Sequence, residues 1–161
     1  MELPKRKQNR ITGYDYSKPG AYFITICTDK RRNLFWENVG AIIDRPEDVV
    51  LSEAGRIVER CIDDISNRYH MVCVDWYVIM PNHIHLLMRI DTDSDGRPMV
   101  APTISTVVQQ MKGAASKEMG FSLWQKGYHD HVIRGERDYR EIWEYIDDNP
   151  RKWKEDRLNS E

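Results

Sequence analysis

The sequence predicts an α+β protein: an antiparallel sheet with the order strand, helix, strand, strand, helix, strand, followed by one added C-terminal helix. Two observations predict it. Runs of β-branched and aromatic residues alternate with segments whose apolar residues repeat at helical spacing, and a last helical segment follows the final strand. This order is that of a ferredoxin-like split βαββαβ sheet with both inner helices on one face. At 161 residues the chain fits one domain, residues 1–161.

The first half of the chain supplies the first strand and the first helix. Residues 20–28 are β-branched and aromatic and predict a strand that ends at the polar turn of residues 29–33. Ser52 stands where a helix N-cap belongs, and apolar residues then repeat at helical spacing, which predicts an amphipathic helix over residues 53–66. Residues 34–51, between these elements, carry no motif that predicts a role.

The second half begins with a hairpin. Residues 72–79 and 83–90 predict two strands, and the proline-containing turn at residues 80–82 is short enough to make them antiparallel neighbours. A polar loop follows, after which Thr103 caps a second amphipathic helix. Residues 128–133 predict the last strand of the sheet.

Composition excludes several classes of protein. The 31% charged fraction and the absence of a long apolar run argue against a membrane span, and the basic N-terminus lacks the apolar stretch of a signal peptide. Cys27, Cys61 and Cys73 are widely spaced among aliphatic residues, which predicts three buried thiols in a reducing compartment. We therefore expect a cytoplasmic location and no membrane partner.

Two histidines separated by one residue open the second strand of the hairpin. Successive side chains of a strand alternate between faces, so His83 and His85 project together while Ile84 points the other way. Two imidazoles held in this way make half of a metal site. The same spacing recurs at His129 and His131. Such pairs are also common as solvated positions of a half-buried sheet, so spacing alone leaves both pairs open.

The last helix, over residues 136–148, carries a tyrosine away from its buried face. Its apolar stripe consists of Tyr139, Ile142, Trp143 and Ile146. Tyr145 falls roughly 110° from the centre of that stripe. Asn149 lies one turn further on, before Pro150, which favours a helix end there. Tyr145 and Asn149 can thus face one point together.

These residues together suggest phosphoryl-transfer chemistry. A metal held by two imidazoles and one amide oxygen, without a carboxylate, keeps open positions and its positive charge for a phosphodiester. A positioned phenol can attack the phosphorus. The resulting phosphotyrosine ester conserves the energy of the phosphodiester bond, so a second hydroxyl can rejoin the strand.

Three motifs in order carry a resemblance to a known family. They are Pro-Asn-His-Ile-His at residues 81–85, Trp-Gln at 124–125 with Asp-His-Val-Ile-Arg at 130–134, and Tyr-Ile-Asp-Asp-Asn-Pro at 145–150. Together they resemble the single-tyrosine HUH transposases (IS200-like), particularly the REP-associated tyrosine transposases. The resemblance spans about residues 12–153.

The resemblance assigns roles to residues. It implies that His83 and His85 bind the metal, that Asn149 completes the metal site, and that Tyr145 is the nucleophile. It implies a ferredoxin-like fold, magnesium or manganese as cofactor, hairpin-forming single-stranded DNA as substrate, and a 5'-phosphotyrosine intermediate with release of a 3'-hydroxyl. Family members differ in whether two chains exchange their tyrosine helices, so a homodimer stays open.

The resemblance also separates the remaining histidines and tyrosines. His131 lies in a family segment that is not the metal pair, and we expect it to form a structural hydrogen bond from the strand edge to a helix. Tyr139 and Tyr145 are six residues apart, about 240° around the helix, so they do not form paired nucleophiles.

Charged and aromatic residues indicate how the protein could contact DNA. A net charge of -2 gives no global case for nucleic-acid binding, but the local cluster of Lys30, Arg31 and Arg32 is predicted to contact the DNA backbone. Five aromatic residues could stack on unpaired bases, although such residues more often belong to the core: Trp36, Trp76, Tyr77, Trp124 and Tyr128.

Two other functions fit parts of the sequence. A domesticated copy could recognise hairpin DNA without cleaving it. A phosphoesterase acting on small substrates could use His83 and His85 with a carboxylate such as Asp75 and would need no tyrosine.

Overall fold

The computed structural model describes residues 20–40, 43–91 and 103–159, so the N-terminal segment and the predicted polar loop lie outside the described residues. Within these ranges four strands form one antiparallel sheet. They are β1 (Gly20–Cys27), β2 (Val72–Ile79), β3 (His83–Ile90) and β4 (His129–Val132). Their order, β2-β3-β1-β4, is the predicted ferredoxin-like arrangement, with β1 and β3 in the middle.

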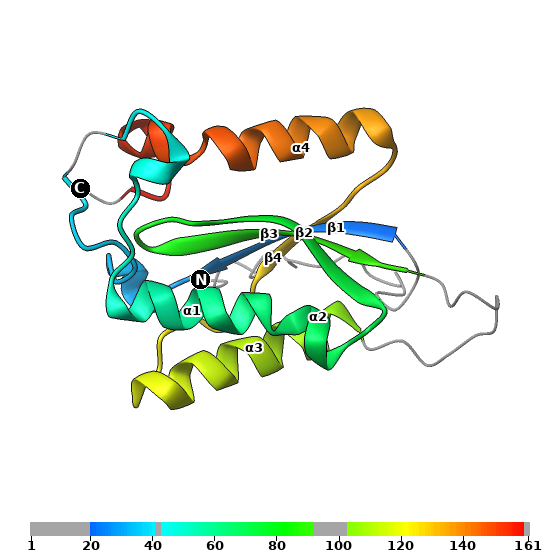
Figure 1. Ribbon diagram of the computed structural model, residues 1–161, viewed down its shortest axis with the longest axis horizontal. Helices are drawn as coiled ribbons and strands as arrows, with labels where there is room; N and C mark the ends of the chain where they lie inside the picture. Colours follow the sequence, from blue (N-terminus) through cyan, green and yellow to red (C-terminus); the bar gives the residue numbers. More distant parts are fainter. Residues whose placement is uncertain (1–19, 41–42, 92–102, 160–161) are drawn as a thin grey trace, which may run out of the picture.

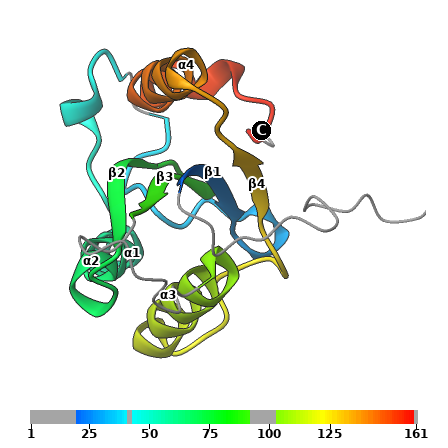
Figure 2. The same ribbon diagram turned by 90° about the vertical axis from the view of Figure 1, so that its right-hand side faces the viewer.

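Helices cover both faces of this sheet (Figure 1). The α-helices are α1 (Glu53–Asp63), α2 (Ile65–Arg68), α3 (Ile104–Met119) and α4 (Glu136–Asp148). The short 3-10 helices are η1 (Asp29–Arg31), η2 (Pro46–Asp48) and η3 (Pro150–Glu155). Both views place α1, α2 and α3 on one face and α4 alone on the other (Figure 2). In the described part of the chain, no helix has the length and apolar character needed to cross a membrane.

Local capping explains where the two inner helices begin. The Ser52 hydroxyl accepts a hydrogen bond from Gly55 N at 3.1 Å, and the Thr103 hydroxyl accepts one from Thr106 N at 3.1 Å. Both predicted N-caps are confirmed. The predicted helix over residues 53–66 is divided into α1 and α2 at Asp64, whose ψ of -14° departs from the α-helical value.

The central strands are buried on both sides because helices cover both faces of the sheet. Ile84, Leu86 and Met88 of β3 face the core cluster shared with α1 and α3, and all three are fully buried. Alternation along the strand turns His83 and His85 toward the opposite face, beneath α4. A strand with only one covered face would leave these histidines in water.

Residues 34–51, which carry no sequence motif, contribute aromatic side chains to the core. Phe35 and Trp36 are buried, and the Trp36 Nε1–H donates to the Ile79 carbonyl oxygen at 2.7 Å. Trp124 and Tyr128 are buried as well, in keeping with the core interpretation of the aromatic residues. Trp76 is different: it is 36% exposed and its ring stacks on Trp143 of α4 at 5.0 Å. Tyr77 is half-buried, with its hydroxyl donating to the Glu59 carboxylate at 3.2 Å.

The prediction of three buried thiols is only partly correct. Cys27 is buried, whereas Cys61 and Cys73 are partly buried, and all three are free. Burial raises the pKa of the Cys61 thiol and of the Cys73 thiol, and the carboxylates of Glu118 and Asp91, respectively, act in the same direction.

The tight packing of α1 gives a stability prediction. A methyl group at Gly55 would overlap the Phe35 carbonyl oxygen, whereas one at Gly113, on the exposed side of α3, would meet no atom within 4 Å. We expect Gly55→Ala to lower the free energy of unfolding by about 1–3 kcal/mol. Gly113→Ala should instead raise it, by up to about 1 kcal/mol, because alanine favours the helix. Urea unfolding followed by circular dichroism measures both changes, and equal effects would contradict this packing.

Candidate active site

The histidine pair lies side by side on the face of the sheet that α4 covers. His83 pairs in register with Cys27, and His85 pairs with Thr25. Their ring centroids are 4.7 Å apart. His83 is 0% and His85 is 3% exposed, so the interpretation of the pair as solvated surface positions is excluded. The prediction that both rings share one face is confirmed.

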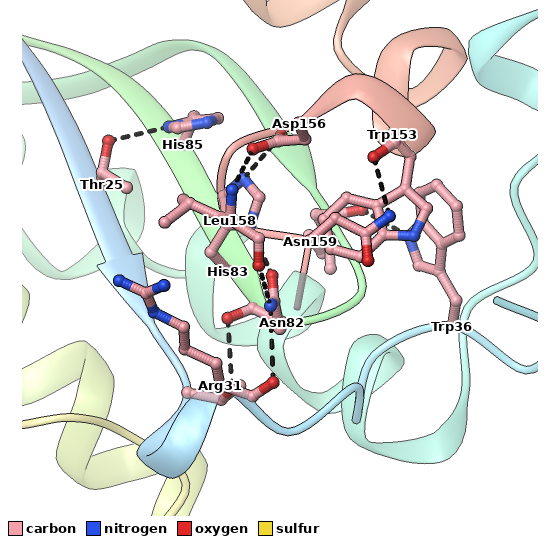
Figure 3. Close-up of polar contacts among 12 residues, drawn as sticks. Thr25, Arg31, Trp36, Asn82, His83, His85, Trp153, Asp156, Leu158 and Asn159 are labelled. Atoms are coloured by element: carbon pink, nitrogen blue, oxygen red, sulfur yellow. Dashed lines mark hydrogen bonds and ion pairs between the residues drawn. The ribbon is translucent and has the colours of Figure 1, made fainter. Parts of the chain in front are cut away.

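Hydrogen bonds to neighbouring residues orient both rings (Figure 3). Asn82 donates from Nδ2 to the carbonyl oxygens of Leu158 at 2.7 Å and Arg31 at 3.4 Å. Its Oδ1 therefore faces Nδ1 of His83, at 2.8 Å, and accepts the proton carried there. Nε2 of His83 is left with its lone pair. Nδ1 of His85 lies 2.8 Å from the Thr25 hydroxyl, an arrangement that likewise directs Nε2 away from the strand.

Burial keeps both imidazoles neutral. Burial, together with the charges of Arg157 and Arg31, lowers the pKa of His83 to about 3. Burial lowers the pKa of His85 well below its usual value, and the neighbouring His83 and Arg157 act in the same direction. Metal ligation requires the neutral form of histidine, so both rings are ready to bind a cation without losing a proton.

Four buried acceptor atoms around this pair lack a hydrogen-bond partner among the described residues. They are Nε2 of His83, Nε2 of His85, Oδ1 of Asn149 and Oδ2 of Asp156. Unpaired buried acceptors are costly, and imidazole nitrogens with amide and carboxylate oxygens are a donor set that divalent cations accept. Within the described ranges, no three His, Cys, Asp or Glu side chains form a complete metal cluster. The amide of Asn149 is therefore needed beside the imidazoles, and the donor set fits a divalent cation.

Tyr145 lies directly beside the histidine pair. Its ring centroid is 5.5 Å from that of His85 and 6.1 Å from that of Phe23, which itself stacks on His85. Tyr145 is 47% exposed, whereas Ile146 on the apolar stripe is fully buried. Its predicted position on the rim of α4 is confirmed. The Tyr145 hydroxyl makes no hydrogen bond to any residue that the structure describes.

Asn149 ends α4 and faces the same open cleft as Tyr145. It is the C-cap residue, only 4% exposed, and Pro150 begins η3 immediately after it. The cleft has a volume of about 780 Å³ and is also lined by Lys152 and Arg157. Its carboxylates are Glu141, Glu144, Asp147, Asp148, Glu155 and Asp156. Because this lining is acidic, a phosphodiester can enter favourably only when positive charge is supplied there.

Two residues considered from the sequence are engaged elsewhere. The Tyr139 hydroxyl donates to Oδ2 of Asp75 at 2.7 Å, and burial together with this carboxylate raises the pKa of Tyr139 to about 12. Asp75 also accepts from Nε of Arg89 at 3.2 Å. These bonds weigh against Asp75 joining the histidines as a ligand. The carboxylate beside His83 is Asp156, which the sequence did not reveal.

The second histidine pair lies at the edge of the sheet. Nε2 of His131 is 2.8 Å from Oδ2 of Asp138 on α4, and Asp138 also accepts from Arg134 N at 3.1 Å. The expected structural hydrogen bond from the strand edge to a helix is thus confirmed. His129 is exposed and pairs in register with Thr25 from the far side of β1.

The basic turn lies next to the histidine pair. Lys30, Arg31 and Arg32 are exposed, and Lys30 and Arg31 adopt left-handed backbone angles, with φ of 56° and 53°. The bond from Asn82 to the Arg31 carbonyl oxygen ties this turn to the start of β3 (Figure 3). The Arg32 guanidinium lies 5.7 Å from the ring centroid of Phe121, which is 43% exposed.

Comparison with known proteins identifies the family. Residues 16–149 match the family model described as Transposase IS200 like. This chain belongs to the IS200-like transposase family. An uncharacterised protein of Haemophilus influenzae is 33% identical over 172 residues, covering 95% of this chain and 92% of that protein. A second protein of that organism, provisionally named a REP-associated tyrosine transposase, is 22% identical and covers 86% of this chain and 74% of that protein.

A solved structure shares the fold of this transposase. It is a REP-associated tyrosine transposase bound to a REP hairpin, with a TM-score of 0.64 and 20% identity, covering 89% of this chain and 74% of that one. The ferredoxin-like fold and the resemblance to REP-associated tyrosine transposases are both confirmed. Family membership supports a DNA-processing enzyme with a role in DNA transposition.

Proposed function

We propose that this IS200-like transposase cuts and rejoins single-stranded, hairpin-forming DNA through a 5'-phosphotyrosine intermediate on Tyr145. The observation that carries the proposal is the Tyr145 ring, half-exposed at an open cleft and 5.5 Å from the ring of His85. Few packing arrangements need an exposed tyrosine beside a buried histidine whose Nε2 has no hydrogen-bond partner among the residues described. A nucleophile placed beside a metal ligand accounts for both features.

His83, His85 and Asn149 would hold magnesium or manganese through Nε2, Nε2 and Oδ1, their three unpartnered atoms. When bound, the cation supplies positive charge that stabilises the negative charge developing on the phosphoryl oxygens. The protein's own part is to keep the imidazoles neutral and oriented. Asn82 and Thr25 provide that orientation through the two Nδ1 atoms.

The covalent step begins when the Tyr145 hydroxyl oxygen attacks the phosphorus of a phosphodiester, losing its proton to solvent at the open cleft. A new bond forms between the tyrosine oxygen and phosphorus, and the bond from phosphorus to the 3'-oxygen of the preceding nucleotide breaks. That oxygen takes up a proton and leaves as a 3'-hydroxyl. Attack by another 3'-hydroxyl on the phosphotyrosine reverses the step and releases Tyr145.

One chain contains the whole of this arrangement. The ring of Tyr145 contacts the ring of His85 of the same chain, and Asn149 lies four residues beyond Tyr145 at the end of the same helix. This contact supports action of the nucleophile in cis. A homodimer is therefore not needed to complete the site.

Two alternatives from the sequence receive unequal support. Asp75 is bound to Arg89 and Tyr139, which weighs against a small-molecule phosphoesterase that uses it with the histidines. A hairpin-binding module without turnover would keep the fold and the basic turn but needs no half-exposed tyrosine at the cleft. Covalent capture of a labelled hairpin oligonucleotide distinguishes all three functions.

The basic turn gives a prediction about DNA binding. Replacing Lys30, Arg31 and Arg32 together with glutamine should weaken binding of a hairpin oligonucleotide and flatten its salt dependence. Each lost phosphate contact should reduce the slope of log K against log salt concentration by about 0.7–0.9. Fluorescence anisotropy at several salt concentrations measures this slope.

A control variant removes the same charge elsewhere. Lys117, Arg137 and Arg140 are exposed on α3 and α4 and are changed together to glutamine. This control should change the slope less than the turn variant does. An unchanged slope in the turn variant would show that Lys30, Arg31 and Arg32 are solvated surface residues that do not contact the DNA.

A further inference from the structure

The C-terminal segment folds back over the histidine pair. After α4, η3 places Trp153 with its ring centroid 6.0 Å from that of His83, and Trp153 is only 4% exposed. Asn82 then holds the segment through its 2.7 Å bond to the Leu158 carbonyl oxygen. Figure 3 shows Asp156 between these two anchors, above His83 and pointing toward it.

The Asp156 carboxylate is fixed in one orientation. Its Oδ1 accepts a hydrogen bond from Leu158 N at 2.8 Å, so Oδ2 points away from the Leu158 backbone. Oδ2 is buried and has no hydrogen-bond partner in the part of the chain that the structure describes, and the side chain is 6% exposed. This oxygen lies 3.7 Å from Nε2 of His83, which is longer than a hydrogen bond.

The pairing of these two atoms is unfavourable without a cation. Asn82 accepts the His83 proton at Nδ1, so the lone pair of Nε2 faces a carboxylate oxygen in a buried environment. Two lone pairs in such a place repel each other unless positive charge lies between them. Two donor atoms that share one divalent cation, each about 2.1 Å from it, lie about 3–4 Å apart. The observed separation of 3.7 Å fits that spacing.

We propose that Asp156 is a further ligand of the cation held by His83, His85 and Asn149, and that the C-terminal segment therefore forms part of the metal site. Among the described residues, no three His, Cys, Asp or Glu side chains converge as a metal cluster before an ion binds, so Asp156 completes its ligation by a shift of its side chain when the cation binds. This inference rests on the proposed function. It adds a carboxylate from outside residues 16–149, the range that matches the family model. A carboxylate oxygen suits magnesium and manganese better than a purely neutral donor set does.

Asp156 also changes the charge of the site. Its carboxylate offsets part of the charge of a divalent cation, so affinity for the cation rises while attraction for the phosphodiester falls. The Arg157 guanidinium lines the same cleft, next in sequence, and supplies positive charge at the place where the phosphodiester would enter. The C-terminal segment thus contributes charges of both signs.

Manganese binding to the full-length protein tests this role without any cleavage. The electron paramagnetic resonance signal of free Mn²⁺ reports how much ion is bound in wild type, Asp156→Asn, Glu136→Gln and His83→Ala. Asparagine keeps the Oδ1 acceptor for Leu158 N, so the segment should retain its fold, which circular dichroism and thermal unfolding check. Glu136 is exposed at the opposite end of α4 and does not line the cleft, and Glu136→Gln makes the same change of charge.

We expect Asp156→Asn to raise the Kd for Mn²⁺ about tenfold or more, with Glu136→Gln unchanged from wild type. An unchanged Kd for Asp156→Asn, with His83→Ala weakened, would overturn this inference alone and leave the carboxylate as an anchor of the segment. Tighter binding by Asp156→Asn would also overturn it, since the carboxylate would then compete with the ion. Equal binding by wild type and His83→Ala would overturn the proposed metal site itself.

Discussion

Alanine at His83 or at His85 is expected to abolish cleavage of hairpin-bearing single-stranded DNA in magnesium or manganese, with the fold intact. Each substitution removes one of two buried imidazole nitrogens that have no hydrogen-bond partner among the described residues and that can bind a cation. Losing several kcal/mol of charge stabilisation in the transition state should slow cleavage about a thousandfold or more. Product formation on a denaturing gel measures the rate, and circular dichroism checks the fold.

The second histidine pair provides the matched control. His129→Ala and His131→Ala should leave cleavage and metal binding intact, because His129 is exposed and His131 is bonded to Asp138. Metal binding lost in these variants, but kept in the His83 and His85 variants, would show that the wrong pair was chosen. Asn149→Ala should have a milder effect than either His83 or His85 substitution, because water can replace one neutral oxygen ligand.

Phenylalanine at Tyr145 is expected to remove cleavage completely while leaving binding and stability nearly unchanged. The ring contacts with His85 and Phe23 remain in the variant, and the lost hydroxyl makes no hydrogen bond within the described residues. The free energy of unfolding should therefore change by no more than about 0.5 kcal/mol. Manganese titration and DNA anisotropy measure binding, and a gel assay measures cleavage.

Tyr139→Phe, on the same helix, reverses this pattern. The Tyr139 hydroxyl donates to Asp75, so its loss should cost about 1 kcal/mol of stability and leave cleavage intact. Cleavage that persists in Tyr145→Phe would mean that water, and not a tyrosine, attacks the phosphodiester.

Local sequence signals predicted the elements that position the site. The N-cap hydroxyl groups of Ser52 and Thr103 and the short turn at residues 80–82 act over a few residues, so each could be read directly from the chain. The period of two placed His83 and His85 on one face for the same reason. The rim position of Tyr145 followed from helical spacing alone.

Features that depend on distant packing were not predictable in this way. The burial of His83 and His85 depends on α4 and the segment after it covering the second face of the sheet, and nothing within β3 signals that cover. The engagement of Asp75 by Arg89 and Tyr139 was not predictable because these partners lie 14 and 64 residues away along the chain. Asp156 becomes adjacent to His83 only because η3 reverses the chain after Pro150.

The most direct measurement is to locate the DNA on the protein. A hairpin oligonucleotide labelled on the 3' side of the cut is incubated with the protein and Mn²⁺, and the denatured adduct is digested with trypsin. Cleavage after lysine and arginine separates Tyr145, in residues 141–151, from Tyr139, in residues 138–140. We expect the label on the peptide of residues 141–151 and none in Tyr145→Phe, while a label on the 5' side leaves on a fragment with a 3'-hydroxyl. A label on the Tyr139 peptide, or cleavage of a hairpin with no covalent adduct, would contradict the assignment of Tyr145 as the nucleophile.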